Sequence, residues 1–317
     1  MVACEIEWNN LTIARWDELF ANVRRSTLLQ HFPYAQATRA TQQIGARHGL
    51  IHIDGQPAGL VQLGEVGILG NAIHAITLDR GPLWLDGWSR QACTEAFFTE
   101  FARQFPRRFG RKMRIMPELA HDRSSSRLLE DCGLKRNANF HGYQTIWLDL
   151  TRDEDRLRAK LNGKWRNILS KAERSGLVVE RDVELDTASS FLAEYEADQL
   201  RKNFKGTSQG FLLSLMKYMG VRREVMILNA KRDDEIVAAI LVLVHGRSAT
   251  YQVGWTTDQG RKFGAHHRLL WEAVVTLKHE GVTDFDLGGV NDEGAAGVKK
   301  FKLGLGGQMV DLVGMYS

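Results

Sequence analysis

The sequence contains few cysteines and few prolines. Among its 317 residues there are three cysteines and five prolines. The cysteines, Cys4, Cys93 and Cys132, are odd in number and no two of them have a CxxC spacing, which argues against a disulfide framework and against a thiolate zinc site. Such cysteine usage is typical of a reducing compartment, so we expect a cytoplasmic protein.

Long hydrophobic runs are also missing. The longest apolar run covers residues 236–244, far fewer than the roughly 20 residues that a membrane-spanning helix needs. Residues 1–10 include two acids and no apolar core of signal-peptide length. We therefore expect no integral membrane segment.

Neither sign of charge dominates the chain. Lysine and arginine total 42, aspartate and glutamate total 38, and the formal net charge is +4. This balance permits an anionic partner without requiring one.

The length and the hydrophobic content of 44% allow a large core and favour two domains. We place these domains at residues 1–150 and 151–317.

The pattern of apolar runs in the first half recurs in the second half. In each half, three strand-like runs are followed by an amphipathic helix and one more strand. Ala58 and Ala238 lie in matching runs, and such pairs are separated by roughly 170 to 180 residues. Trp84 with Trp255 and Ile115 with Leu287 are the other pairs. The repetition predicts two copies of one mixed α/β unit.

A basic segment joins the two halves. Residues 153–175 are predicted to form one helix, in which apolar residues recur at helical spacing and leave the basic residues on the outer faces. Such a helix either links two domains with a solvated face or binds an anion. The basic residues are Arg156, Arg158, Lys160, Lys164, Arg166, Lys171 and Arg174.

Residues 284–307 combine glycines with clustered lysines. The segment starts as an alternating strand, breaks at two glycines, and continues with Lys299, Lys300 and Lys302. Glycine lets main-chain N–H groups approach an anion, and the ammonium groups add charge. The segment is therefore predicted to be a C-terminal loop that holds an anionic ligand, with a solvated surface loop as the alternative.

Two motifs carry a resemblance to a known family. The sequences LRAKLNGKWRNILSKAERSG at 157–176 and GVKKFKLGLGG at 297–307 resemble signatures of the Fem family of peptidoglycan interpeptide-bridge aminoacyltransferases. Each half also resembles the acyltransferase fold of the GNAT superfamily. The resemblance implies an α/β fold with mixed sheets and two tandem GNAT-like domains. The resemblance also implies that the first domain serves as a platform and forms a wall of the substrate cleft.

The resemblance also implies an activity. It implies a transferase that moves an amino acid from aminoacyl-tRNA to an amine of a peptidoglycan precursor, a UDP- or lipid-linked muropeptide, or to another peptide amine. An aminoacyl ester is already activated, so the reaction needs positioning and charge stabilisation of the tetrahedral intermediate rather than a covalent enzyme intermediate. No cofactor is implied beyond the donor itself.

The family resemblance assigns roles to several cationic residues. Lys302 is similar to the family lysine that approaches the acceptor end of the tRNA, and we expect it to stabilise charge near the reacting ester. Arg201 and Lys202, at the end of a predicted helix, stand where family members carry an arginine for nucleotide phosphates. A solvated helix end is the alternative for this pair.

Other candidates come from the residues and their neighbours. Lys299 or Lys300 is expected to hold a phosphate, and Arg166 is either structural or faces a phosphate. Asp286, on the strand before the glycines, is a candidate proton acceptor. The aromatic candidates for stacking on a base are Tyr251 and Trp255, although aromatic residues at strand ends more commonly belong to the core.

Two adjacent histidines do not indicate a metal site. His266 and His267 point to different faces of the predicted helix, and no carboxylate or third histidine lies at ligand spacing. We therefore expect no metal and interpret the pair as a helix cap or as exposed.

Two other functions remain open. Residues 261–265 resemble the GNAT loop that holds the pyrophosphate of coenzyme A, which favours acyl transfer from acetyl-CoA or another acyl-CoA to a small amine. His266 in place of the final small residue argues against this function. The basic helix favours a non-enzymatic nucleic-acid-binding module, against which the near-neutral net charge and the lack of a recognised motif count.

Overall fold

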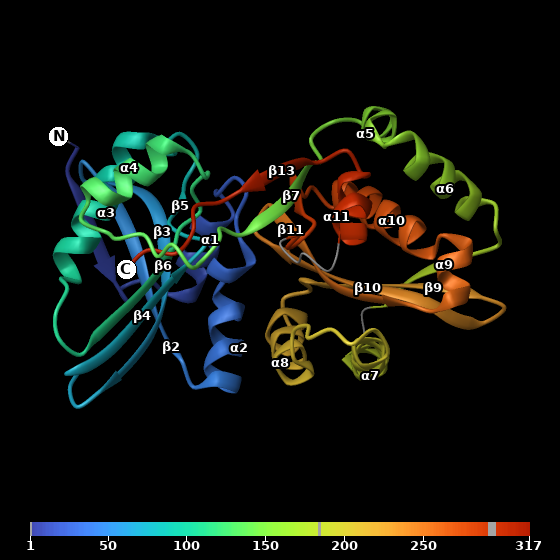
Figure 1. Cartoon of the computed structure of the whole chain (residues 1–317), viewed down its shortest axis with the longest axis horizontal. Coiled ribbons are helices and arrows are strands. Elements are labelled where there is room, and N and C mark those ends of the chain that lie inside the picture. The colour runs from blue at the N-terminus through green and yellow to red at the C-terminus, as the bar shows by residue number, and fades with distance from the viewer. Residues whose placement is uncertain (1, 183–184, 291–295) are drawn as a thin grey trace. The chain divides into compact units, whose positions relative to one another are not determined.

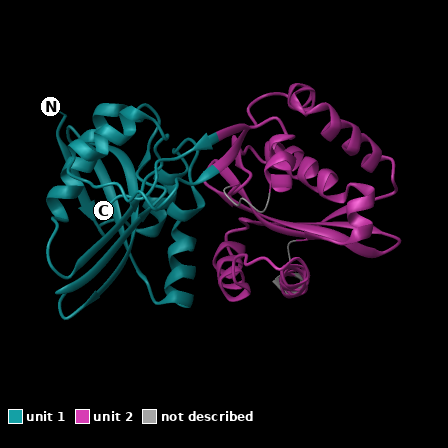
Figure 2. Cartoon of the chain, viewed as in Figure 1, with its two compact units in different colours: residues 1–144, 310–317 teal, residues 145–309 magenta. Residues whose placement is uncertain are grey.

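The computed structural model describes residues 2–182, 185–290 and 296–317. The chain forms two compact units, coloured separately in Figure 2. Unit 1 contains Met1–Gln144 and Val310–Ser317, and unit 2 contains Thr145–Met309. The division lies a few residues before the expected position, and the last residues of the chain belong to unit 1 rather than to the second domain.

Unit 1 is built on a six-stranded sheet in the order β1-β2-β3-β4-β6, with β5 paired to β3. All neighbours are antiparallel except β4 and β6, which are parallel. Asp54 and Gly55 connect β2 and β3 with positive φ angles of 49° and 77°, as a two-residue hairpin turn requires. The strands are β1 (Cys4–Trp8), β2 (Gly45–Ile53), β3 (Gln56–Ile68), β4 (Ile73–Asp79), β5 (Leu83–Trp84) and β6 (Arg111–Met116).

Helices pack on both faces of this sheet because successive strand residues point to opposite sides. On β3, Val61 belongs to a core cluster with Phe97 of α3, whereas Leu60 belongs to another with Trp16 and Phe20 of α1. The helices are α1 (Ile13–Phe20), the 3-10 helix η1 (Leu28–Gln30), α2 (Phe32–Gln42), α3 (Gln91–Gln104) and α4 (Arg123–Asp131).

Unit 2 is built on a seven-stranded sheet in the order β13-β7-β12-β11-β10-β9-β8. β11 and β12 are parallel, and the pairs β12–β7, β10–β11, β10–β9 and β8–β9 are antiparallel. The strands are β7 (Gln144–Asp149), β8 (Val178–Asp182), β9 (Val225–Arg232), β10 (Glu235–His245), β11 (Ser248–Thr256), β12 (Asp284–Asp286) and β13 (Gln308–Asp311).

The helices of unit 2 lie on both faces of its sheet. Figure 1 shows α5, α6 and α10 over one face and α7 and α8 over the other. Leu269 and Leu270 of α10 are fully buried in one core cluster with Ile240 of β10. Within the described ranges, no helix has the length and apolar character of a membrane span. The helices are α5 (Glu154–Lys160), α6 (Gly163–Glu173), α7 (Leu185–Lys202), α8 (Gln209–Gly220), α9 (Asp258–Phe263), α10 (Ala265–His279) and α11 (Ala296–Leu303).

The two units repeat one topology, as the sequence predicts. The order β1-β2-β3-β4-β6 in unit 1 corresponds to β8-β9-β10-β11-β12 in unit 2. In each unit the last two strands of this series are parallel and a helix, α3 or α10, connects them. One predicted match is wrong, because Trp84 lies on the short strand β5 whereas Trp255 lies on β11.

Two predicted elements differ from the structure. The basic segment 153–175 forms two helices rather than one, because the chain leaves helical geometry at Leu161 and Asn162. The lysines predicted in a C-terminal loop lie on the helix α11, and residues 291–295 of that loop are outside the described residues.

Asn162 caps the second basic helix, since its side chain accepts a hydrogen bond from the backbone N–H of Lys164 at 3.0 Å. We expect Asn162→Ala to lower the free energy of unfolding by about 1 kcal/mol, because that N–H loses its partner. Urea denaturation measures this change. Asn167→Ala, an exposed position inside α6, is the matched control and should not destabilise the protein. Equal stability of the two variants would show that the cap contributes nothing.

Candidate functional site

In unit 2, the parallel strands β11 and β12 pair only over the first part of β11. β11 pairs with β12 only over Ser248–Thr250 and Asp284–Asp286, and β11 then continues along β10. The β10–β11 register shifts so that Tyr251 and Val253 face consecutive residues of β10, which makes Gln252 a bulge. Bulges of this kind often lie beside functional sites, where they change the direction of side chains.

Lys302 extends from α11 to the point where the two strands part. Its Nζ donates a hydrogen bond to the carbonyl oxygen of Gly289 at 3.0 Å and lies 5.4 Å from the centroid of the Tyr251 ring. The residue is only 7% exposed. Gly288 borders the same site with a φ of +74°, and an added Cβ would lie 2.9 Å from the Tyr251 carbonyl oxygen, so a side chain is disfavoured there.

Burial lowers the pKa of the Lys302 amine from 10.5 to about 8, and nearby Asp286 partly opposes this shift. Loss of hydration disfavours the ammonium form, while a neighbouring carboxylate favours it. An amine with this pKa exists in both protonation states near neutral pH. It can stabilise a developing negative charge when protonated and accept a proton when neutral.

Two hydrogen-bond donors fix the Asp286 carboxylate. Its Oδ1 accepts hydrogen bonds from the hydroxyl of Thr145 and, at 2.8 Å, from the backbone N–H of Gly288. The side chain is buried. The carboxylate thus fixes the turn that carries Gly288 and places a negative charge near Lys302.

Arg201 and Lys202 lie together at the end of α7. They form ion pairs with Asp198 at 3.2 and 2.5 Å, and the Asp198 carboxylate is buried while both cations are exposed. Burial, followed by the nearby Tyr195 and Asp198, raises the pKa of Tyr251. The α7 residues and Tyr251 are therefore close enough to interact electrostatically.

The other predicted site residues do not lie with Lys302, Tyr251 and Asp286. Arg166 and Lys300 are exposed and Lys299 is partly exposed. Trp255 is 3% exposed and is a core residue rather than an accessible stacking surface. The structure thus places Lys302, Tyr251 and Asp286 together, and Arg201 and Lys202 near them through Asp198.

The two histidines are neither a helix cap nor exposed, contrary to the sequence-based interpretation. His267 packs between Trp165 and Phe301, with ring centroids 4.8 and 4.9 Å away, and His266 packs edge-on against Phe301. Burial lowers the pKa of each histidine to about 4, and nearby Lys202 adds to the shift of His266. Both imidazoles are therefore neutral at pH 7.

The sequence contains a signal for the partial burial of His266. His266 stands three and four residues before Leu269 and Leu270, and the same spacing places it on the apolar stripe of α10. No group of three or more histidine, cysteine, aspartate or glutamate side chains suited to a metal ion occurs among the described residues.

The start of α10 is covered by α6. Gly264 precedes this helix with a φ of +71°, and a Cβ added there would lie 2.8 Å from the side chain of Ile168 on α6. Ala265, the first residue of α10, is fully buried. A helix N-terminus binds a phosphate through exposed backbone N–H groups, and here Gly264 and Ala265 are both buried.

Comparisons with known proteins agree with this architecture. Residues 155–303, just under half of the chain, match the family model described as an acetyltransferase (GNAT) domain. A solved structure of FemX is 14% identical with a TM-score of 0.81, and the alignment covers 98% of this chain and 96% of that one. The chain has a tandem GNAT fold. No curated protein has a sequence that matches it.

Two other solved structures share the tandem GNAT fold. A tandem GNAT protein from the clavulanic acid biosynthesis pathway is 15% identical with a TM-score of 0.52, and 98% of each chain is covered. The C-terminal domain of a putative lysylphosphatidylglycerol synthetase from Agrobacterium fabrum is 16% identical with a TM-score of 0.53, covering 96% of this chain and 92% of that one. At these identities the likeness establishes the fold alone.

We expect Lys302 to titrate in the folded protein with a midpoint near pH 8. Its folded pKa lies below its unfolded value, so unfolding takes up a proton between about pH 8 and 10.5, and the free energy of unfolding should rise with pH in this window. Nuclear magnetic resonance of labelled lysine Cε atoms measures the midpoint. The low-titrating signal should be absent in Lys302→Met and present in Lys217→Met, which changes an exposed lysine on α8. A midpoint near 10.5 would contradict the assignment.

Proposed function

We propose that this GNAT-fold acyltransferase moves an aminoacyl group from aminoacyl-tRNA to an amine of a peptidoglycan precursor or related peptide. The observation that carries the proposal is the buried amine of Lys302, which lies 5.4 Å from the Tyr251 ring where β11 and β12 part. The motif around this lysine, GVKKFKLGLGG, resembles the Fem family signature, and the tandem fold is similar to that of FemX.

The reaction fits the chemistry of this site. The acceptor amine attacks the ester carbonyl, a C–N bond forms, and the C–O bond to the ribose of the tRNA breaks. The amine loses a proton and the ribose oxygen gains one. In its protonated form Lys302 stabilises the negative charge on the carbonyl oxygen of the tetrahedral intermediate, and burial strengthens this interaction.

The remaining candidates serve substrate binding in this proposal. Arg201 and Lys202 bind phosphates of the acceptor, exchanging part of their ion pairs with Asp198 for phosphate oxygens. The partly exposed Lys299 and the exposed Lys300 and Arg166 supply further positive charge to phosphates. Asp286 fixes the Gly288 turn and keeps part of the Lys302 amine protonated. Of the two aromatic candidates, Tyr251 is the one beside Lys302.

A second candidate function is acyl transfer from coenzyme A, which the match of residues 155–303 to an acetyltransferase (GNAT) domain favours. The burial of Gly264 and Ala265 at the start of α10 argues against it, because a pyrophosphate would bind to exposed backbone N–H groups there. The two functions differ in their donor, so the donor decides between them.

We expect Lys302→Met to lower aminoacyl transfer about 100-fold or more, because the stabilising charge is lost while the fold is kept. The assay supplies purified protein with charged, labelled tRNA and a UDP-linked muropeptide and follows label on the peptide. Lys217→Met, an exposed lysine of α8, is the control and should transfer at the wild-type rate.

The same assay separates the alternatives. Wild-type activity in folded Lys302→Met would refute the role of this lysine. Transfer from acetyl-CoA to an amine, with no transfer from charged tRNA, would support the second function. Tight binding of RNA regardless of charging, without any transfer, would indicate a nucleic-acid-binding module instead.

A further inference from the structure

The end of the hairpin between β3 and β4 carries apolar side chains in contact with water. Val66, Ile68 and Ile73 are 44 to 56% exposed, and Leu69 at the turn is 81% exposed. The strand register places Val66 opposite Ala75 and Ile68 opposite Ile73. Residues paired across antiparallel strands point to the same face, so these side chains form one apolar stripe on the hairpin.

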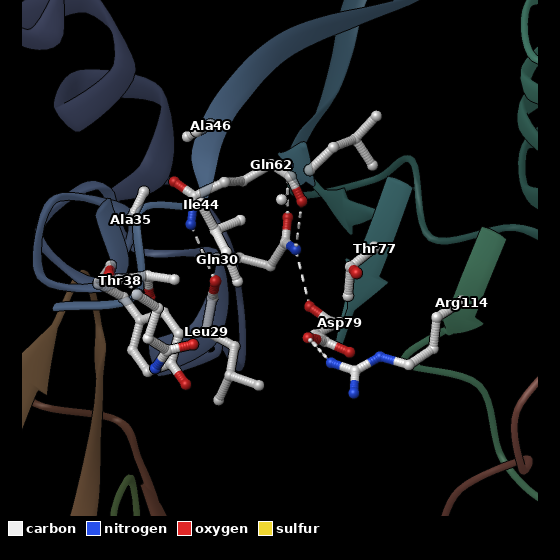
Figure 3. Close-up of a pocket in the computed structure, with 15 residues that line it drawn as sticks. Leu29, Gln30, Ala35, Thr38, Ile44, Ala46, Gln62, Thr77, Asp79 and Arg114 are labelled. Atoms are coloured by element: carbon white, nitrogen blue, oxygen red, sulfur yellow. Dashed lines mark hydrogen bonds and ion pairs between the residues drawn. The ribbon is translucent and has the colours of Figure 1, made fainter. Parts of the chain in front are cut away.

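The cover over this face of the sheet ends before the stripe. Nearer the middle of the sheet, Thr77 of β4 lines a cavity together with Leu29 of η1 and Thr38 of α2 (Figure 3). Thr77 and Ala75 are two residues apart on β4 and therefore share a face. The pairing of β2 with β3 also ends, at Glu65. Beyond these residues the stripe is open to solvent.

An exposed phenylalanine lies beside the hairpin turn. Phe109, in the loop between α3 and β6, is fully exposed. The guanidinium of the preceding residue, Arg108, donates hydrogen bonds to the backbone carbonyl oxygens of Asn71 and, at 2.9 Å, of Ala72. These bonds hold the loop against the turn. We call this surface the hairpin patch, and it consists of Val66, Ile68, Leu69, Ile73 and Phe109.

Positive charge lies next to the hairpin patch. Residues 66–75 and 106–114 contain five arginines and lysines and no aspartate or glutamate. Lys112 is exposed, and its register with Ala75 places it on the same face as the stripe. Arg108 and Arg111 donate to backbone carbonyl oxygens, which are uncharged and leave both positive charges in place.

The carboxylates near the hairpin already have partners. Glu65 accepts hydrogen bonds from Arg47 and lies 2.6 Å from the ring of His74. Asp79 forms an ion pair with Arg114 at 2.9 Å, which Figure 3 shows. These acids therefore do not cancel the excess positive charge beside the hairpin patch.

Apolar groups flanked by cations select the type of partner. An exposed apolar patch marks an interaction site, and a bilayer with anionic lipids offers acyl chains to the apolar groups and phosphates to the cations. RNA would also attract the cations, but the four aliphatic side chains cannot stack on bases. A second copy of the chain would bring the same positive charge, which repels.

We propose that the hairpin patch and the cations beside it bind the surface of a membrane that contains anionic phospholipids. The apolar side chains enter the membrane interface, and Arg108 and Lys112 meet lipid phosphates. The surface lies entirely in unit 1 and does not depend on the acyl transfer proposed for unit 2.

The test measures sedimentation of the full chain with lipid vesicles at low salt. The chain should bind vesicles of equal parts phosphatidylglycerol and phosphatidylcholine about tenfold or more tightly than vesicles of phosphatidylcholine alone. Leu69→Asn and Phe109→Ser should each weaken this binding about tenfold, because a large apolar side chain is lost from the membrane. Lys112→Gln should weaken it about fivefold.

The substituted positions are suited to the test because their side chains are exposed. Leu69 has a φ of +53°, which asparagine adopts more readily than leucine, so Leu69→Asn should keep the turn. The matched controls lie in unit 2. Val221→Asn changes a valine that is also 81% exposed, and Lys217→Gln changes an exposed lysine of α8. Both should bind vesicles like the wild type.

Several outcomes would overturn the proposal. Equal binding to the two kinds of vesicle would contradict the role of the cations, and unchanged binding in both Leu69→Asn and Phe109→Ser would contradict that of the hairpin patch. In a chain that does not bind vesicles, tRNA binding or a dimer that these substitutions abolish would assign the patch to RNA or to a second copy. Vesicle binding is measured without tRNA or muropeptide, so its outcome is separate from that of the transfer assay.

Discussion

The chemistry proposed for unit 2 depends on keeping one amine out of water. Placing the Lys302 amine in a nearly dry position is costly for its charged form, and the structure offsets that cost with the Gly289 carbonyl, the face of Tyr251 and the nearby Asp286 charge. The parting of β11 from β12 makes room for this group, and α11 supplies it. The bulge at Gln252 lies in β11 just beyond its last pair with β12.

The two copies of the topology have diverged at equivalent places. In unit 1 the helix after the parallel pair, α4, contributes Leu128 and Leu129 to an apolar core, whereas the corresponding helix of unit 2, α11, contributes Lys302. Duplication thus gives one scaffold with two different interiors.

Hydrophobic periodicity was sufficient to predict the repeated strands and helices, because each element has a buried stripe or face that leaves a clear pattern. The break at Asn162 was missed because a short cap interrupts a pattern that remains periodic on both sides. The motif predicts Lys302 as a site residue, but its burial, the ion pairs of Asp198 and the packing of His266 arise from contacts between distant segments. Spacing along the chain carries no information about such contacts.

Unit 1 is not a continuous piece of chain. Val313 and Tyr316 are buried in its core, and Tyr316 exchanges backbone hydrogen bonds with Ile115, although unit 2 separates these residues in the sequence. During synthesis the ribosome must therefore finish all of unit 2 before the last core residues of unit 1 become available. The half that is translated first is the half that is completed last.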